Sequence, residues 1–400
     1  MLNNALNPTQ IHSLCQLAYE ANGTTIQRLK PLLQRSTAIQ LDANTLEILD
    51  GHTGMVLPTQ SGMGFMVRPK GARQNEIIIA TRGTASLSDA GTDLYTPPLI
   101  GPTGHLVHAG FNQTFKSYVQ QLKQFISHKN LGFRPSAIHC MGHSLGGALA
   151  NLNAAAFAEL GFSTYLYTVA APRVGMIPYA EHLSKKFNPQ NVFRVANTVD
   201  PVTMLPCFPY LHAPYRFGMY LIEGGSFINP MQHMLGTGYT SMNKKSWAQL
   251  ESGTKARQAF LEQEMRDMLA PIGNKTMEER MVLGASMFSG KLFRLINYRI
   301  NQILRKYGGT HLMSVANHNS GSFTVLDQVA EILVKCLGVA STAKKQVGEV
   351  VGMIYKFAGW GHQKAEEITA AVVRWAFTLL AQTLMAVANK ALAQFSRPLL

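Results

Sequence analysis

Short apolar runs alternate with longer amphipathic stretches between about residues 75 and 225. Five runs have the length and the β-branched and aromatic content of strands, at 76–83, 136–142, 163–175, 191–200 and 215–225. Helical periodicity lies between several of them, at 112–128, 145–160 and 178–187. This alternation predicts an α/β domain with a mostly parallel central sheet.

The first residues predict a helix. Asn7 and Pro8 have the order of an N-cap followed by proline at the first helical position, and Gly23 ends the periodic stretch. A signal peptide has a basic segment followed by an apolar one. The residues at the start of the sequence do not have this pattern. We therefore expect a protein that is cytoplasmic or exported by a non-classical secretion system, and that acts at a membrane surface.

Beyond about residue 245 the pattern changes to long helical periodicity. We place a boundary there, with an α/β domain at 1–245 and a mainly α-helical C-terminal extension at 246–400. Between Arg280 and Leu326 there are six basic residues and no acidic one. An apolar stripe recurs there at helical spacing, at Leu292, Leu295, Ile296, Ile300, Ile303, Leu304 and Tyr307. Two interpretations stay open, a helix in a membrane interface and an ordinary helix packed on a core.

A second apolar stretch lies near the C-terminus. Trp375–Asn389 carries no charge, yet it is shorter than the roughly 20 residues that span a bilayer. We interpret it as a buried core helix or as an amphipathic helix in contact with a membrane.

Composition narrows the class of protein. The chain has 400 residues, of which 46% are hydrophobic and 14% charged, as in a folded protein with a large buried core. The net charge is +14, and residues 251–400 carry half of this excess in fewer positions. Such charge suits anionic membranes or nucleic acid, but no nucleic-acid motif accompanies it. The four cysteines form no CxxC pair, which argues against a disulfide framework or a structural zinc site.

Gly142-His143-Ser144-Leu145-Gly146 lies where a predicted strand meets a predicted helix. Glycines two positions before and after a serine permit the tight strand-to-helix turn of a nucleophile elbow. The alternative is a glycine-rich turn whose serine only caps the helix. The strand before and the helix after favour Ser144 as a nucleophile, with the Leu145 N–H facing an oxyanion.

Several stretches together resemble the class 3 (fungal lipase-like) lipases of the α/β-hydrolase fold. They are "IIIATRGTASLSDAGTDL" at 77–94, "VHAGFNQTF" at 107–115, "MGHSLGGALA" at 141–150, "YTVAAPRVG" at 167–175 and "RVANTVDPVTMLP" at 194–206. The resemblance covers about residues 10–245 and leaves the C-terminal extension unmatched. It implies an α/β-hydrolase fold and a Ser-Asp-His triad.

The triad needs an acid and a base after Ser144 in the chain. Asp200 follows a predicted strand and precedes Pro201, where a turn can hold its carboxylate at the sheet edge. The resemblance points to His233 as the base, because it precedes Tyr239 in a context similar to the family's. The other histidines after Asp200 are His212, His311, His318 and His362. His311 is the main rival, and His212 is better explained as a packing histidine.

The resemblance also implies an oxyanion hole formed by the backbone N–H groups of Leu145 and Thr84, with Asp93 supporting the Thr84 hydroxyl. The segment at 85–101 matches the family's lid but has few apolar residues. We therefore expect a poorly sealing lid and little interfacial activation. His105 and His108 form an HxxH pair without further metal ligands, so we interpret them as structural.

These features predict a serine hydrolase that cleaves carboxylic ester bonds of lipids through an acyl-enzyme, without cofactor or metal. The basic charge favours phospholipid over triacylglycerol as substrate and a membrane surface as partner; we expect no nucleic acid. The alternative is a membrane-binding or membrane-disrupting protein whose C-terminal helices act on bilayers. It could be an antibacterial secreted effector, with an unknown inhibitory or delivery protein as partner.

Overall fold

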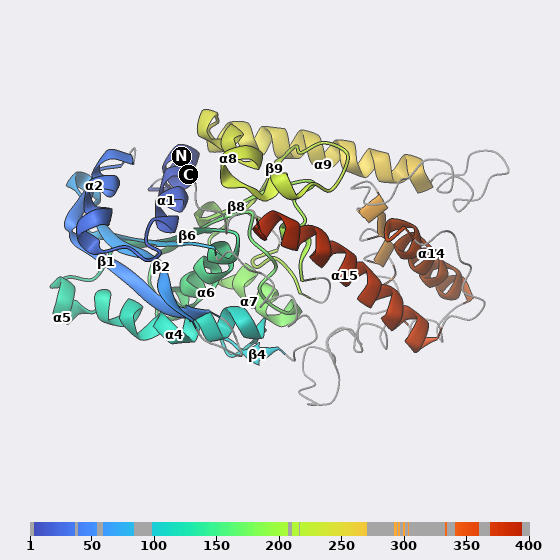
Figure 1. The fold of residues 1–400 in the computed structure, drawn as a ribbon, viewed down its shortest axis with the longest axis horizontal. Coiled ribbons are helices and arrows are strands. Elements are labelled where there is room, and N and C mark those ends of the chain that lie inside the picture. The colour runs from blue at the N-terminus through green and yellow to red at the C-terminus, as the bar shows by residue number, and fades with distance from the viewer. Residues whose placement is uncertain are drawn as a thin grey trace.

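The computed structural model in Figure 1 shows an α/β sandwich with a helical layer at one end. It describes residues 4–36, 39–53, 59–83, 98–206, 210–215, 217–269, 341–359 and 369–393, together with isolated positions between 292 and 333. The expected lid at 85–101 and the rival His311 therefore lie mostly or wholly outside the described residues.

A seven-stranded sheet forms the centre of the molecule. In spatial order its strands are β1 (Leu41–Thr53), β2 (Thr59–Pro69), β3 (Glu76–Thr81), β6 (Ala137–His143), β7 (Thr164–Val169), β8 (Val192–Asn197) and β9 (Met219–Ile222). Within this sheet β3, β6, β7, β8 and β9 run parallel, whereas β1–β2 and β2–β3 pair antiparallel. The predicted α/β-hydrolase fold with a mostly parallel sheet is confirmed. The antiparallel pair at 41–69 was not predicted.

Helices cover both faces of the sheet. One face carries α1 (Pro8–Tyr19), α2 (Ile26–Ser36) and the start of α9 (Trp247–Leu269), and the other carries α4 (Ala109–Phe125), α6 (Leu145–Glu159) and α7 (Ile177–Lys186). The smaller elements are β4 (Leu99–Ile100), β5 (Leu106–Val107), α5 (His128–Leu131), α8 (Leu235–Gly238), η1 (Gly71–Arg73), η3 (Pro189–Asn191), η4 (Val202–Met204), η5 (Pro230–His233) and η6 (Thr240–Lys244).

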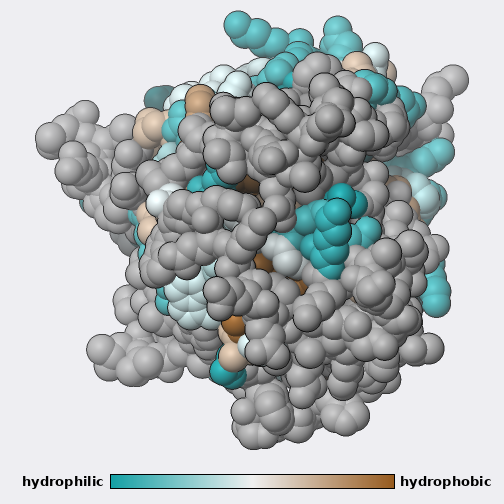
Figure 2. Space-filling model, turned by 90° about the vertical axis from the view of Figure 1, so that its right-hand side faces the viewer, coloured by the Kyte–Doolittle hydropathy of each residue, from teal (hydrophilic) through white to brown (hydrophobic). Residues whose placement is uncertain are grey.

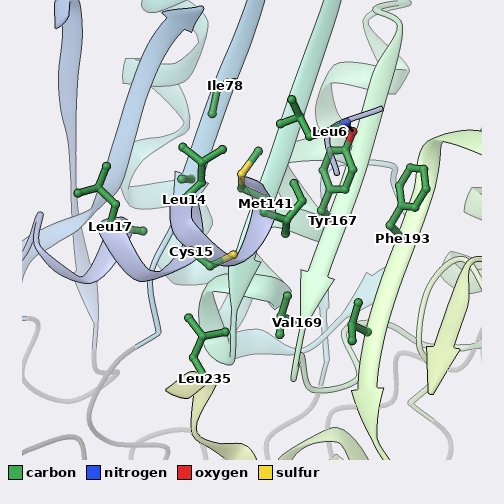
Figure 3. Close-up of a cluster of buried hydrophobic side chains, with 14 of the residues drawn as sticks. Leu6, Leu14, Cys15, Leu17, Ile78, Met141, Tyr167, Val169, Phe193 and Leu235 are labelled. Atoms are coloured by element: carbon green, nitrogen blue, oxygen red, sulfur yellow. Dashed lines mark hydrogen bonds between the residues drawn. The ribbon is translucent and has the colours of Figure 1, made fainter. Parts of the chain in front are cut away.

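Helix α1 begins as its sequence predicts. The Asn7 side chain accepts from the Gln10 N–H, while the Gln10 side chain accepts from the Asn7 N–H. This reciprocal capping satisfies two backbone donors that the first turn leaves unpaired. Figure 3 shows the buried side of the helix, including Leu14 and Cys15, packed over the sheet near Ile78 and Met141. The free thiol of Cys15 is buried in this cluster, and burial raises its pKa.

An aromatic row ties the start of α9 to the same face. The rings of Tyr167, Phe193 and Tyr220 follow one another across β7, β8 and β9, and the Trp247 ring lies 4.5 Å from the Phe193 ring. The Trp247 indole N–H also donates to the Leu6 carbonyl at 2.7 Å. The boundary at 245/246 remains a prediction, and this packing places the first turns of α9 with the α/β core.

The C-terminal helices α14 (Ser341–Phe357) and α15 (Ala370–Ala393) pack on each other and on the core. Their shared apolar cluster includes Val202, Leu205 and Ile228 from loops of the α/β part. The described members of the predicted apolar stripe, Leu292, Leu295, Ile296, Ile300 and Ile303, are buried in the same cluster. In this conformation the stripe forms part of a core.

Helix α15 has one side inside this cluster and one side outside. Its stretch Ala371–Asn389 is, by length and composition alone, sufficient to cross a membrane. Phe377, Leu380 and Leu384 are nevertheless buried, whereas Arg374 and Gln382 are exposed. Figure 2 shows this end of the molecule, where the described residues that project outward are mainly hydrophilic and hydrophobic ones appear mainly in recesses. The core-helix interpretation fits this packing.

Candidate active site

Ser144 lies at the sharp turn between β6 and α6. Its φ is +59°, in the left-handed region, which costs a non-glycine residue about 1–3 kcal/mol and must be held by its surroundings. The Ser144 side chain makes no capping hydrogen bond to α6. The alternative of a simple helix-capping serine therefore does not describe this turn. The strained backbone instead directs Oγ toward His233.

Close backbone contacts hold the turn. A Cβ atom at Gly142 would lie 2.2 Å from the Gly146 carbonyl oxygen, and one at Gly146 would lie 2.2 Å from the Thr81 carbonyl oxygen. The Thr81 hydroxyl donates to the carbonyl groups of Met141 and Gly146 at 3.0 and 2.7 Å. Both glycines are therefore required for β3 and α6 to approach each other here.

The structure brings Ser144, His233 and Asp200 together at the carboxyl edge of the parallel strands. His233 Nε2 is 2.8 Å from Ser144 Oγ, and His233 Nδ1 is 3.0 and 3.1 Å from the two Asp200 carboxylate oxygens. All three side chains are buried. Because the carboxylate faces Nδ1, that nitrogen carries the proton and Nε2 is left to accept one from the serine.

The Asp200 carboxylate has further donors. The Tyr239 hydroxyl donates to Oδ2 at 2.7 Å, and the Val202 N–H donates to Oδ1 at 2.9 Å. The Asn197 N–H in turn donates to the Tyr239 oxygen at 2.9 Å. This buried carboxylate is thus hydrogen-bonded on both oxygens, as a buried charge requires. The sequence indicated Tyr239 only as context for His233 and missed its contact with the acid.

The histidine is carried by the short helix η5, whose first turn is capped by Asn229, which accepts from the Met231 N–H at 2.9 Å. Of the other candidates, His212 Nε2 lies 2.9 Å from the Thr203 carbonyl, where burial and the nearby Arg194 hold its pKa well below the usual range. His212 therefore packs as a neutral ring. His311, His318 and His362 lie outside the described residues.

The oxyanion side of the site is described in part. Leu145 begins α6, so its N–H belongs to the first turn, where backbone donors have no partner within the helix. Thr84 and Asp93 lie outside the described residues. The preceding Arg82 is buried and donates to the carbonyl groups of Gly62 and Gly83 and to the Asn22 side chain. Arg82 thus holds the turn that leads to Thr84.

The His105–His108 pair does not converge on one point. His105 Nδ1 lies 3.0 Å from the Thr103 hydroxyl, whereas the buried His108 ring packs on Phe111 with the ring centres 4.3 Å apart. Across the described parts of the chain, no group of three or more His, Cys, Asp or Glu side chains is arranged to hold a metal ion.

Residues 78–210, which include Ser144 and Asp200, match the family model of the class 3 lipases. This part of the chain is a class 3 lipase domain. A secreted mono- and diacylglycerol lipase of Fusarium solani is 31% identical over 178 residues, covering 43% of this chain and 51% of that protein. A lipase of Rhizomucor miehei is 33% identical over 161 residues, covering 36% and 42%. The chain thus spans about half the length of the curated relatives that it matches.

Solved lipases are also similar to this chain. The mono- and diacylglycerol lipase of Aspergillus oryzae is 23% identical with a TM-score of 0.39, over 55% of this chain and 77% of that one. The lipase of Rhizopus microsporus var. chinensis has the same identity and TM-score, over 54% and 71%.

The relatives correct one prediction. The absence of a signal-peptide pattern led us to expect a cytoplasmic protein as one alternative. The relatives of this lipase domain include secreted lipases of Fusarium solani and Gibberella zeae. The cytoplasmic alternative is therefore wrong, and the comparison points to an exported protein. The prediction rested on the first residues alone, and a folded hydrolase domain has no residue pattern that distinguishes an exported protein from a cytoplasmic one.

Proposed function

We propose that this protein hydrolyses carboxylic ester bonds of lipids, with Ser144 as nucleophile, His233 as general base and acid, and Asp200 as the group that orients His233. The observation that carries the proposal is the continuous hydrogen-bond path from Ser144 Oγ through the His233 ring to the Asp200 carboxylate, with distances of 2.8 and 3.0 Å. The class 3 lipase match over residues 78–210 supports lipid esters as the substrate class.

The chemistry follows from the proton positions. His233 Nε2 takes the Ser144 proton while Oγ attacks the acyl carbonyl, and Asp200 stabilises the imidazolium that forms. The Leu145 N–H, with Thr84 as the proposed second donor, stabilises the tetrahedral oxyanion. Its collapse breaks the ester bond, and His233 returns the proton to the leaving alcohol. Water, activated by His233, then releases the fatty acid from the acyl-enzyme.

The finer substrate preference rests on charge. A net charge of +14 attracts the protein to anionic surfaces, which favours phospholipids in a bilayer over neutral acylglycerols. The relatives from Fusarium solani and Gibberella zeae are mono- and diacylglycerol lipases, so acylglycerols are the competing substrate class. For a membrane-disrupting protein, the C-terminal helices would have to release apolar faces that lie in a core in this structure. Ester hydrolysis is therefore the function that we propose.

The test combines product analysis with labelling of the serine. Wild-type protein is incubated with vesicles of anionic phospholipid and, separately, with diacylglycerol emulsions, and the released fatty acids are measured by mass spectrometry. We expect hydrolysis that Ser144→Ala and His233→Ala each reduce by at least roughly 10⁴-fold. A fluorophosphonate probe should label Ser144 in the wild type. Labelling elsewhere, or full hydrolysis by Ser144→Ala, would exclude this triad.

A further inference from the structure

The C-terminal end of α1 reaches the active site from a part of the chain more than a hundred residues before the nucleophile. The Tyr19 hydroxyl lies 2.7 Å from Nδ1 of His143, the residue before Ser144. The same hydroxyl is hydrogen-bonded to the backbone of Gly83. A Cβ atom at Gly83 would lie 2.6 Å from the Tyr19 oxygen and 3.0 Å from Ser144 Cβ. One hydroxyl therefore contacts both Gly83, in the turn that precedes the proposed oxyanion residue Thr84, and His143 in the nucleophile elbow.

The other side of the His143 ring contacts the histidine of the triad. His143 Nε2 lies 2.9 Å from the His233 backbone carbonyl oxygen, and the two rings are 5.0 Å apart between centres. A carbonyl oxygen only accepts hydrogen bonds, so Nε2 must carry the proton. The ring of His143 is therefore a donor toward His233.

This assignment determines the second hydrogen bond. Burial, together with the nearby His233, lowers the pKa of His143 well below its usual range, so the ring is neutral. A neutral imidazole that donates through Nε2 can only accept at Nδ1. The Tyr19 O–H is consequently the donor, and its oxygen is left to accept from the Gly83 N–H. The hydrogen bonds run in one direction, from Gly83 through Tyr19 and His143 to His233.

Helix α1 also contacts the same segments at other points. His12 Nε2 lies 3.2 Å from the Leu235 carbonyl, and the Thr9 hydroxyl donates to the Asn243 carbonyl at 2.9 Å. Asn22, just after α1, accepts from Arg82 at 3.0 Å. Hydrogen bonds thus join α1 and the residues after it to the segment that follows His233 and to Arg82, beside Gly83. These contacts hold the Tyr19 hydroxyl in place.

We propose that Tyr19 is a positioning residue for the reaction. Its hydroxyl fixes the tautomer of His143, and this chain of hydrogen bonds holds the His233 backbone and the Gly83 turn at a constant distance from Ser144. The proposal rests on the proposed hydrolase function. Since a displacement of about 1 Å in an active site can cost on the order of a hundredfold in rate, loss of one hydroxyl here changes turnover without removing any group that touches the substrate.

The test compares Tyr19→Phe with Tyr118→Phe. The buried Tyr118 hydroxyl donates to the Asn153 side chain at 3.1 Å, between α4 and α6, and does not contact the triad. With the soluble ester p-nitrophenyl butyrate, we expect Tyr19→Phe to lower kcat roughly tenfold and to change KM by less than about twofold. Tyr118→Phe also removes one buried hydroxyl, so it should lower Tm about as much as Tyr19→Phe does. It should leave kcat unchanged. Circular dichroism at the assay temperature checks that both variants are folded.

A spectroscopic measurement separates this proposal from the proposed function. In protein with 15N-labelled histidine, wild-type His143, assigned by the signal lost in His143→Gln, should be protonated on Nε2 and not on Nδ1. In Tyr19→Phe the Nδ1 signal should shift, because that nitrogen loses its donor. A wild-type His143 protonated on Nδ1, or an unchanged kcat in Tyr19→Phe, would overturn the role of Tyr19. An inactive wild type with Ser144 unlabelled would instead overturn the hydrolase proposal.

Discussion

At the scale of single residues, Asp200, the proposed acid of the triad, accepts a hydrogen bond from a tyrosine hydroxyl. Tyr239→Phe removes the 2.7 Å hydrogen bond to Asp200 and leaves the buried Asn197 N–H without its acceptor. We expect the free energy of unfolding to fall by about 1–3 kcal/mol, the usual cost of unpaired buried groups. We also expect a loss of kcat, because the carboxylate that orients His233 is less firmly held. Urea denaturation and ester hydrolysis measure the two effects.

Two further variants make this prediction specific. Asp200→Asn should lower kcat far more than Tyr239→Phe, since the amide no longer stabilises the imidazolium. The double variant should lose little beyond Asp200→Asn alone if Tyr239 acts on catalysis through the carboxylate. That link would be contradicted if the double variant lost as much transition-state stabilisation as the two single variants together.

His108 should make the protein less stable in acid. Burial lowers the pKa of His108 to about 4, below the value of about 6.5 in an unfolded chain. Below pH 6.5 the unfolded chain therefore takes up the proton first, and stability is lost as the pH falls from 6.5 toward 4. The full loss is on the order of 3 kcal/mol. Denaturation at several pH values should show a shallower decline for His108→Phe, whose ring can still pack on Phe111. Parallel curves for the two proteins would contradict this origin.

At the residue scale, the sequence predicted side chains that the structure brings together, although their catalytic roles remain a proposal. Ser144 could be proposed because GxSxG prescribes a turn, and Asp200 because it follows a predicted strand, whereas His233 was implied by the resemblance to the class 3 lipases. Tyr19 could not be found, because its place beside His143 depends on how α1 packs across the sheet. Contacts of that kind leave no spacing pattern in the chain.

At the scale of elements, the elbow depends on the absence of a side chain at Gly146. Gly146→Ala places a methyl group 2.2 Å from the Thr81 carbonyl, so β3 and α6 must move apart. We expect loss of activity and a stability loss of roughly 1–3 kcal/mol. The matched control is Gly253→Ala in α9, where a Cβ would meet nothing within 4 Å. That variant should gain up to about 1 kcal/mol from helix propensity and keep its activity. Equal activity of both variants would show that the turn tolerates expansion.

Strand β2, which was not predicted from the sequence, also contains glycines at which a side chain would clash with neighbouring backbone. In β2, a Cβ at Gly62 would lie 2.1 Å from the Ala21 carbonyl and one at Gly64 would lie 2.0 Å from the Ala80 carbonyl. Because glycine in a sequence indicates a turn, the sequence of β2 did not have the pattern of a strand. Strands β3 and β6 were predictable because all their residues are buried, which favours a mainly apolar sequence.

At the scale of the whole molecule, the C-terminal helices share one core with the loops that carry Asp200 and His233. The cluster around α14 and α15 includes Val202 and Met204 of η4, which follows Asp200. It also includes Ile228, just before η5 and His233. Apolar periodicity predicted these helices but not their partner, because an apolar stripe fits a bilayer and a protein core equally well. The extension thus packs behind the loops that carry Asp200 and His233.

Leu380→Ala tests whether the apolar side of α15 packs in the protein core or contacts a bilayer. Leu380 is 2% exposed, inside the cluster on α15, so its truncation should lower the free energy of unfolding by about 2–5 kcal/mol. The catalytic loops lose support on the same side, so kcat on a soluble ester should fall as well. Gln382→Ala, on the exposed side of the same helix, should change neither quantity. If α15 instead served a bilayer, Leu380→Ala would weaken binding to anionic vesicles while stability and soluble-ester turnover stayed at the wild-type level.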